Sequence, residues 1–211
     1  MYSNTKLYQE LNKGNIEKTK EMLLDNIREE SSSKNGTKKP FTVVQNMFKK
    51  LDKADFERFG NKAIPMKDGR FGFIDGHRVF IADSDLGYTD RADFKLEQAL
   101  QSVNDFDREV EIDVTELKKF IAVVKAEKRN KWESPKPYII EMADGYMIGA
   151  NPNFLKDAID YSGITKIRFV KSYGNIQKTP LYFIDNENNI IAVVLPVYIN
   201  QEESQVTQKV S

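Results

Sequence analysis

The 211-residue chain contains no cysteine and a single histidine, His77. Without cysteine it can form no disulfide, hold no thiolate-bound metal and use no cysteine nucleophile. With one histidine and no Asp/Glu set at ligand spacing, the sequence also predicts neither a metal nor another cofactor. A lone histidine most often has a structural role, so any other role for His77 has to follow from its neighbours.

An excess of charge of one sign is also lacking, because 32 Lys and Arg residues balance 32 Asp and Glu residues. No overall field therefore favours nucleic acid or a membrane, and binding of either kind would need local clusters. The sequence has no apolar span of about 20 residues and no cationic leader followed by an apolar stretch. We therefore expect a cytoplasmic protein with no membrane partner.

The apolar pattern divides the chain into three parts. Residues 1–36 are expected to be an N-terminal helical segment, broken at Gly14, followed by a linker in the Ser/Gly/Lys-rich stretch 31–40. The helical stripe comprises Leu7, Leu11, Ile16, Leu23, Leu24 and Ile27. It is thin, so the segment either docks on the body or serves as an oligomerisation arm.

The body, 37–200, is expected to form one domain or two sub-units, 37–108 and 109–200, before a disordered polar tail at 201–211. Helices are predicted after Phe41, after the capping residues Asp113–Thr115, and after Asn151-Pro152. Short strands separated by turn signals lie between them. This order predicts an α+β fold with antiparallel sheets and helices packed on one face.

Two segments of the body are the most informative. Asp75-Gly76 is a dipeptide typical of tight hairpins and joins two short strands within 71–81. The run Ile190–Ile199 is apolar along its length, with Pro196 near its close. Because proline has no N–H for a ladder, we interpret this run as one strand, buried over most of its length, with its apolar end facing a cleft.

These segments resemble the bacterial DNA polymerase III beta subunit, the sliding clamp. Asp75-Gly76-His77-Arg78-Val79 is similar to the clamp's Thr-Asp-Gly-His-Arg-Leu, and Leu195-Pro196-Val197 to its final Leu/Met-Pro-Val/Met. The stretch Tyr146–Ile159 is similar to the clamp's strand, Asn-containing cap and helix with Leu-x-Asp-Ala-Leu. Ile74 stands where the family usually has threonine, and the chain is too short for three clamp domains.

The resemblance implies a DNA-clamp-like fold and a non-enzymatic role in DNA replication, with no catalytic residue. It implies an apolar groove that receives clamp-binding peptides of replication proteins. By matching position, the groove residues would be Gly76, His77, Arg78, Val79, Val193, Leu195, Pro196 and Val197. The shortened architecture suggests a mobile-element or phage origin, and closing a ring from it would require a homo-oligomer.

The family's second surface is a helix-lined face where cations meet the phosphates of double-stranded DNA. The helices after Phe41 and Thr115 are expected to provide it here, through Lys49, Lys50, Lys53, Lys118, Lys119, Lys125, Lys128 and Arg129. A solvated helix surface is the more ordinary interpretation of such lysines. The alternative function is therefore a protein-interaction module that has the clamp fold and does not bind DNA.

Overall fold

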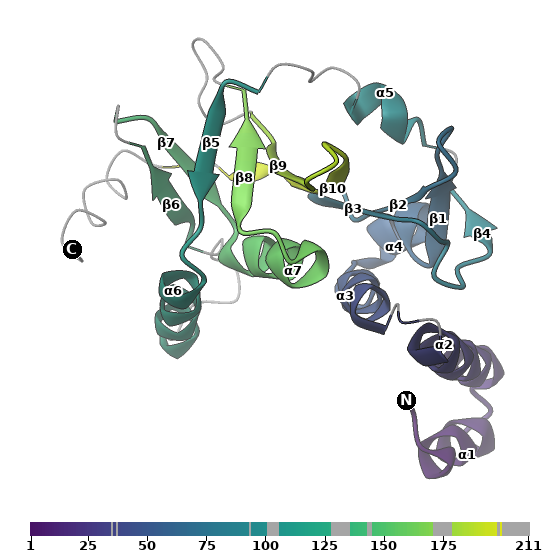
Figure 1. The fold of residues 1–211 in the computed structure, drawn as a ribbon. Coiled ribbons are helices and arrows are strands. Elements are labelled where there is room, and N and C mark those ends of the chain that lie inside the picture. The colour runs from purple at the N-terminus through teal and green to yellow at the C-terminus, as the bar shows by residue number, and fades with distance from the viewer. Residues whose placement is uncertain are drawn as a thin grey trace. The chain divides into compact units, whose positions relative to one another are not determined.

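The computed structural model describes residues 1–34, 36, 38–92, 94–100, 106–127, 136–142, 145–170, 179–197 and 199, without the side chains of residues 98 and 99. The chain forms two compact units, neither of them continuous in sequence (Figure 1). The first contains Met1–Phe73 and Ala82–Phe94, and the second contains Ile74–Ile81 and Lys95–Ser211. The domain boundaries given by the sequence stay a prediction, and the expected tail at 201–211 lies outside the described residues.

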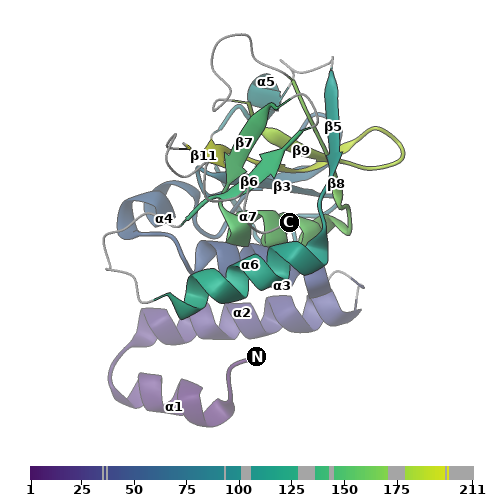
Figure 2. The same ribbon diagram turned by 90° about the vertical axis from the view of Figure 1, so that its left-hand side faces the viewer.

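The N-terminal segment forms two helices, α1 (Asn4–Asn12) and α2 (Ile16–Lys34). Gly14 separates them with a φ of 77°, a conformation that glycine adopts without strain, and this confirms the predicted break. Asn26 on α2 accepts a hydrogen bond from the backbone nitrogen of Tyr2 at 2.6 Å. The start of α1 therefore lies beside the middle of α2, and the two helices form a hairpin (Figure 2).

Most of the predicted apolar stripe of this segment is not the face through which its helices pack. Leu7 is buried, as expected, and α2 buries Thr19 and Met22, which the stripe did not include. The remaining members of the stripe are exposed: Leu11, Ile16, Leu23, Leu24 and Ile27. Helix α2 thus packs through a face offset from its most apolar one.

The predicted linker at 31–40 is also wrong over most of its length. Helix α2 continues to Lys34, and helix α3 (Lys38–Phe48) begins soon after. Ser33 donates a hydrogen bond to the carbonyl of Glu29 at 2.8 Å, and Lys34 pairs with Glu30 at 2.8 Å. The Glu30–Lys34 pair stabilises this end of the helix, and the Ser33 hydroxyl is satisfied by the helix's own backbone.

An aromatic cluster forms the core of the first unit. The ring of Tyr88 lies 5.3 Å from Phe48, 5.8 Å from Phe73 and 6.1 Å from Phe41, measured between centroids. All four rings are buried. The Phe48 and Phe73 contacts are edge-on and the Phe41 contact is stacked, and both geometries add to the stabilisation from area burial. The same unit holds elements that the sequence did not predict: helix α4 (Lys53–Phe59) and strands β1 (Lys62–Pro65) and β4 (Asp90–Arg91).

Strand pairing in this unit is mixed. Strand β1 pairs antiparallel with β2 (Phe71–Ile74) and parallel with β4. The parallel pair is two residues long. The segment that contains Tyr88 leads directly into β4 and connects it to the core of the unit. Its presence is a small departure from the antiparallel pattern that the sequence predicts.

The second unit is built on antiparallel strands, which confirms the expected α+β class. One sheet has the order β3-β10-β9-β8-β5, and a three-stranded sheet has the order β11-β7-β6. The first sheet comprises β3 (Arg78–Ala82), β5 (Arg108–Glu111), β8 (Lys166–Phe169), β9 (Leu181–Ile184) and β10 (Ile190–Val194). The second comprises β6 (Tyr138–Glu141), β7 (Met147–Ala150) and β11 (Pro196–Val197).

Helices α6 (Val114–Ala126) and α7 (Pro152–Ser162) pack against each other, and α7 packs on β9 and β10 (Figure 1). Asp113 caps α6 as predicted, accepting hydrogen bonds from the backbone nitrogens of Thr115 and Glu116 at 2.7 and 3.1 Å. Asn151 caps α7 through one such bond, from the backbone nitrogen of Asn153 at 3.0 Å. A short helix, α5 (Leu96–Leu100), precedes β5.

The terminal apolar run is two strands rather than the single strand predicted. Strand β10 ends at Val194, and β11 begins at Pro196 in the other sheet. Pro196 is the first residue of an edge strand, where the missing N–H costs no ladder bond. The proline therefore marks the point where the chain leaves one sheet for another.

Candidate functional site

The β2–β3 turn is organised by the carboxylate of Asp75. One of its oxygens accepts hydrogen bonds from the backbone nitrogens of His77 and Arg78, at 2.9 and 2.7 Å. Gly76 has a φ of 87°, which favours glycine and confirms the predicted tight turn. The turn thus fixes the direction in which His77 and Arg78 leave it.

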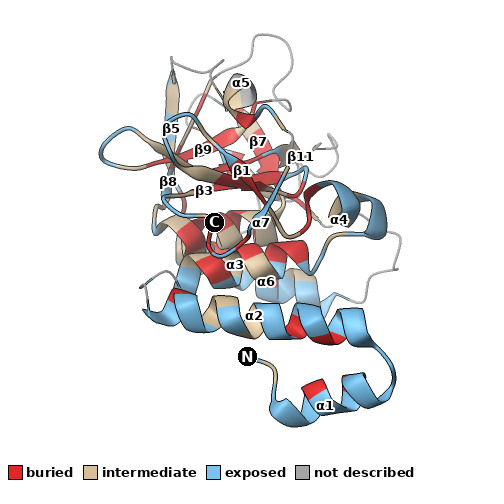
Figure 3. Cartoon of the chain, turned by 90° about the vertical axis from the view of Figure 1, so that its right-hand side faces the viewer, coloured by how far each residue is buried: buried red, intermediate tan, exposed pale blue. Residues whose placement is uncertain are grey.

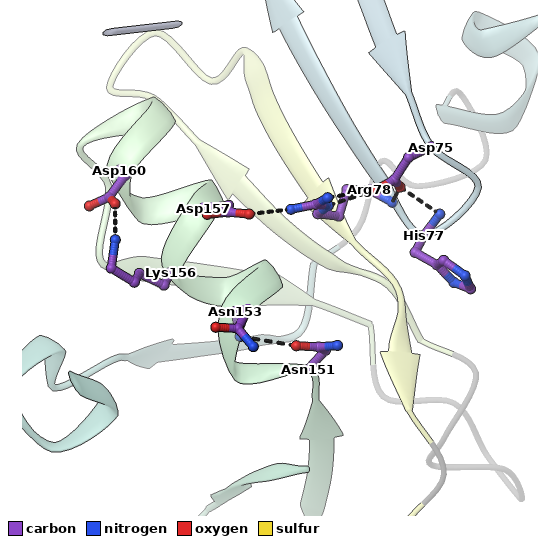
Figure 4. A network of polar contacts seen from close by, with 8 residues as sticks. All are labelled: Asp75, His77, Arg78, Asn151, Asn153, Lys156, Asp157 and Asp160. Carbon is purple, nitrogen blue, oxygen red and sulfur yellow. Dashed lines mark hydrogen bonds and ion pairs between the residues drawn. The ribbon is translucent and has the colours of Figure 1, made fainter. Parts of the chain in front are cut away.

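The Arg78 side chain is buried, and neighbouring carboxylates compensate its charge. Its Nε donates to the second Asp75 oxygen at 2.9 Å, and its Nη2 lies 2.7 Å from the same oxygen. A third contact runs from Nη1 to the carboxylate of Asp157 on α7 (Figure 4). Only 2% of Arg78 is exposed, so two carboxylates replace the water that a guanidinium normally binds. The network ties the turn to helix α7.

Phe154 joins this network from the first turn of α7. The Arg78 guanidinium carbon lies 4.2 Å from the centre of its ring, a cation–π contact. The His77 ring stacks on Phe154 with centroids 5.8 Å apart and an interplanar angle of 24°. Phe154 was not among the predicted groove residues. Its contacts with Arg78 and His77 join distant parts of the chain, so no local pattern in the sequence assigns it to the site.

The two sequence motifs lie side by side in the structure. Strands β3 and β10 pair antiparallel, with Val193 opposite Val79 and Val194 opposite Arg78. Beyond the last pair, the backbone nitrogen of Leu195 donates to the carbonyl of His77 at 2.9 Å. Residues from distant parts of the sequence thus meet where β10 ends and β11 begins.

The predicted groove residues divide into exposed and buried sets. Gly76, His77 and Leu195 are exposed, and Pro196 and Val197 are half-buried. Arg78, Val79 and Val193 are buried in the packing behind them. We call the accessible set, together with the half-buried Phe154, the His77–Leu195 surface: Gly76, His77, Phe154, Leu195, Pro196 and Val197.

The lysines predicted for the helix after Phe41, which are Lys49, Lys50 and Lys53, lie outside that helix. Helix α3 ends at Phe48, and Lys49 and Lys50 follow it in a turn. Lys53 is the first residue of α4, because Asp52 caps a new helix by accepting from the backbone nitrogen of Asp55 at 2.9 Å. Lys49 also lines a cavity of about 240 Å³ and lies 3.9 Å from Asp25.

On α6, the predicted lysines Lys118, Lys119 and Lys125 are exposed. Lys119 pairs with Glu116 at 2.7 Å, and this contact raises the pKa of Lys119 above its usual value. Lys128 and Arg129 lie outside the described residues. Lys118 and Lys125 are seven residues apart, so they project from the same side of the helix.

The described residues include no group of three or more His, Asp or Glu side chains that could hold a metal ion. In the described part of the chain, no helix combines the length and the apolar character that crossing a bilayer requires.

The fold and the site define an α+β protein in which a tight turn, a helix start and a strand crossover meet at one surface. No family model matches the chain, and no curated protein matches it. Among solved structures it is similar to a protein described as a DNA polymerase III beta subunit from Eubacterium rectale ATCC 33656, with 18% identity and a TM-score of 0.42 over 76% of this chain and 64% of that chain. It is also similar to the DNA polymerase III subunit beta from Pseudomonas aeruginosa, with 14% identity and a TM-score of 0.44 over 76% of this chain and 65% of that chain. The chain therefore spans less than two thirds of the length of either protein.

Proposed function

We propose that this chain is a non-enzymatic, clamp-like protein whose His77–Leu195 surface binds short linear peptides of replication proteins. The observation that carries the proposal is the hydrogen bond from Leu195 to His77, because it joins the two motifs that resemble the clamp's peptide site. The surface offers apolar side chains for peptide anchors and exposed backbone at Gly76 for close approach.

Within this proposal, Arg78 acts from behind the surface. It is too buried to contact a peptide directly, but it holds Asp75, Phe154 and Asp157 in one arrangement. Preorganised side chains lose less conformational entropy on binding, so a fixed His77–Phe154 stack favours peptide affinity. Val79 on β3 and Val193 on β10 are buried behind the same surface.

The test measures the fluorescence anisotropy of short labelled peptides that carry Leu and Phe anchors in a polar sequence. Leu195→Glu should reduce binding at least tenfold, because it places a charge where an apolar anchor would sit. The matched control is Val123→Glu on α6, since Val123 is also an exposed aliphatic residue (59%, against 41% for Leu195). Equal binding by the two variants, or no binding by the parent chain, would exclude this peptide site.

DNA binding is a second candidate, favoured by the exposure of Lys118 and Lys125 on one side of α6. Two cations at this spacing can contact phosphates of a duplex without reading its bases. Such contacts release counterions, so affinity should fall steeply as salt rises. If this second activity is missing while peptides bind, the chain is an interaction module that does not bind DNA.

The DNA test compares a Lys118→Glu, Lys125→Glu double variant with a charge-matched control, Lys156→Glu with Lys166→Glu. The control lysines already pair with Asp160 and Glu109. Titration of a labelled duplex at low and moderate salt should show weakened binding and a shallower salt slope in the first variant alone. Undetectable duplex binding by the parent chain at low salt would refute this candidate.

A further inference from the structure

Helix α2 carries a row of large apolar side chains that its own unit does not cover. Ile16 is 56% exposed, Leu23 46% and Ile27 62%, and Leu24 beside them is 48% exposed. Figure 3 shows α2 exposed along much of its length. We call Ile16, Lys20, Leu23, Ile27, Glu30 and Lys34 the α2 stripe; these residues repeat at alternating spacings of four and three.

The other sides of α2 are occupied within the unit. Met22 and Thr19 are buried, and Asn26 bonds to Tyr2 beside α1. Arg28 donates to the carbonyl of Gly87 at 3.0 Å and lies over the Tyr88 ring. At 100° per residue, Met22 and Arg28 lie about 120° from the centre of the stripe, Asn26 about 80° and Thr19 about 60°. These contacts therefore flank the stripe and leave its own residues exposed. The stripe therefore faces outward.

We propose that the α2 stripe binds a second copy of this chain, with the two α2 helices antiparallel about a two-fold axis. Alternating spacings of four and three place the stripe residues at the a and d positions of a heptad repeat. In an antiparallel pair, each a position meets a d position of the other helix. Ile27 then packs on Leu23 of the second copy, and Leu24 lies close to the two-fold axis.

Charge complementarity selects the second copy and the antiparallel direction. The register that pairs Ile27 with Leu23 also places Lys20 opposite Glu30 of the second copy. Within one chain, Lys20 already lies 2.7 Å from Glu17, and Lys34 lies 2.8 Å from Glu30. At each end of the interface, the ion pair of Lys20 in one copy therefore lies beside the ion pair of Glu30 in the other. Parallel helices would instead put Lys20 against Lys20 and Glu30 against Glu30.

The contact is isologous, so the same surface serves both copies and closes at a dimer. One helix pair buries less than the roughly 1,600 Å² of a standard interface, so the dimer dissociates on dilution. This inference is independent of the peptide site, which uses residues of the other unit.

Sedimentation velocity of the full chain across a range of micromolar concentrations tests the association. The parent chain should shift from monomer to dimer as its concentration rises. Leu23→Glu with Ile27→Glu should stay monomeric, and the control Val123→Glu, with its exposed apolar residue on α6, should dimerise like the parent. A parent chain that is monomeric throughout, or a double variant that still dimerises, overturns the proposal.

Charge exchange tests the pairing without changing the apolar residues. Lys20→Glu should weaken the dimer at least tenfold, because two carboxylates then face each other. Adding Glu30→Lys to the same chain should restore association, since the opposite charges again meet. Circular dichroism confirms that each variant keeps its helices. Failure of the exchange to restore the dimer contradicts the proposed register.

The lack of cysteine allows a direct test of direction. Lys20→Cys and Glu30→Cys variants, mixed and mildly oxidised, should form a mixed disulfide, because a disulfide needs the two Cα atoms within about 7 Å. Each variant alone should cross-link little. Efficient cross-linking of Lys20→Cys with itself would show parallel helices and overturn the antiparallel arrangement.

Discussion

The backbone nitrogen of Leu195 donates a hydrogen bond to the carbonyl of His77 at 2.9 Å. This bond lies beyond the last paired residues of β3 and β10, at the residue where the chain passes from one sheet to the other. It holds the backbones of two exposed residues, Leu195 and His77, next to each other. The proposed peptide site therefore depends on backbone geometry as well as on side chains.

Replacement of Leu195 separates these two contributions. Leu195→Pro removes the N–H and should lower the free energy of unfolding by about 1 kcal/mol, because the His77 carbonyl loses its partner. Leu195→Ala keeps the N–H and should change stability little, while still weakening peptide binding. Urea denaturation measures the first effect and peptide anisotropy the second. Equal stability of the two variants would mean that the hydrogen bond contributes nothing measurable.

The buried Arg78 network makes a strong stability prediction. Asp75→Asn keeps the shape of the turn but removes the charge that faces Arg78, so it should cost about 3 kcal/mol of unfolding free energy. The control is Asp68→Asn, which breaks the more exposed pair between Asp68 and Arg70. That change should cost at most about 1 kcal/mol. Guanidinium denaturation measures the loss of unfolding free energy in both variants. Similar losses in the two would contradict a buried ion pair at Arg78.

At Tyr88, unlike at Asp75, we expect that removing a buried polar group does not lower the free energy of unfolding. Its hydroxyl is buried without a hydrogen-bond partner among the described residues, and burial raises the pKa of this phenol above its usual value. Tyr88→Phe should leave the free energy of unfolding unchanged or increase it by about 1 kcal/mol. Tyr161→Phe should instead lower it by about 1 kcal/mol, because the Tyr161 hydroxyl donates to the Ile81 carbonyl at 2.9 Å. Thermal unfolding of the two variants measures both changes. A clear loss of stability in Tyr88→Phe would disprove the prediction.

Glu10 gives the α1–α2 hairpin a dependence on pH. Asn15 donates to its carboxylate at 2.8 Å, and Lys18 and Lys13 lie at 3.0 and 3.3 Å. These contacts lower the pKa of Glu10 from 4.5 to about 2. The folded state thus favours the ionised form, so its stabilising contribution is present above pH 4.5 and is lost as the pH falls toward 2.

Glu10→Gln should therefore be less stable than the parent at neutral pH, and the difference should shrink between about pH 4.5 and 2. Thermal unfolding followed by circular dichroism at several pH values measures the difference. Glu17→Gln is the control, because Glu17 is an exposed ion-pair partner on the same hairpin. A difference from the parent that is constant over this pH range would argue against the role of Glu10.

Much of the fold could be predicted from the sequence, because local signals determined it. The caps at Asp113 and Asn151, the break at Gly14 and the turn at Asp75-Gly76 are all short-range effects, and each is present in the structure. Helix α4 and strands β1 and β4 have weak periodicity and depend on tertiary contacts. The terminal run was expected to be one strand because its hydropathy does not show that Val194 and Pro196 pair with different sheets.

The candidate site was predictable in part. The two motifs were placed together through their resemblance to the clamp, and strand pairing brings them together in the structure. Burial of Arg78 was not predictable, since its partner Asp157 lies on a helix far along the chain. The role of Phe154 was missed for the same reason: a stacking contact with His77 leaves no periodic trace in the sequence.

The Arg78 network also bears on the order of folding. Asp75 and Arg78 are three residues apart, so they can meet as the turn forms, at little cost in loop closure. Asp157 must close a much longer loop to reach the same guanidinium. We therefore expect the hairpin to form first and the docking of α7 to come later, so that Asp157→Asn mainly speeds unfolding, whereas Asp75→Asn also slows refolding.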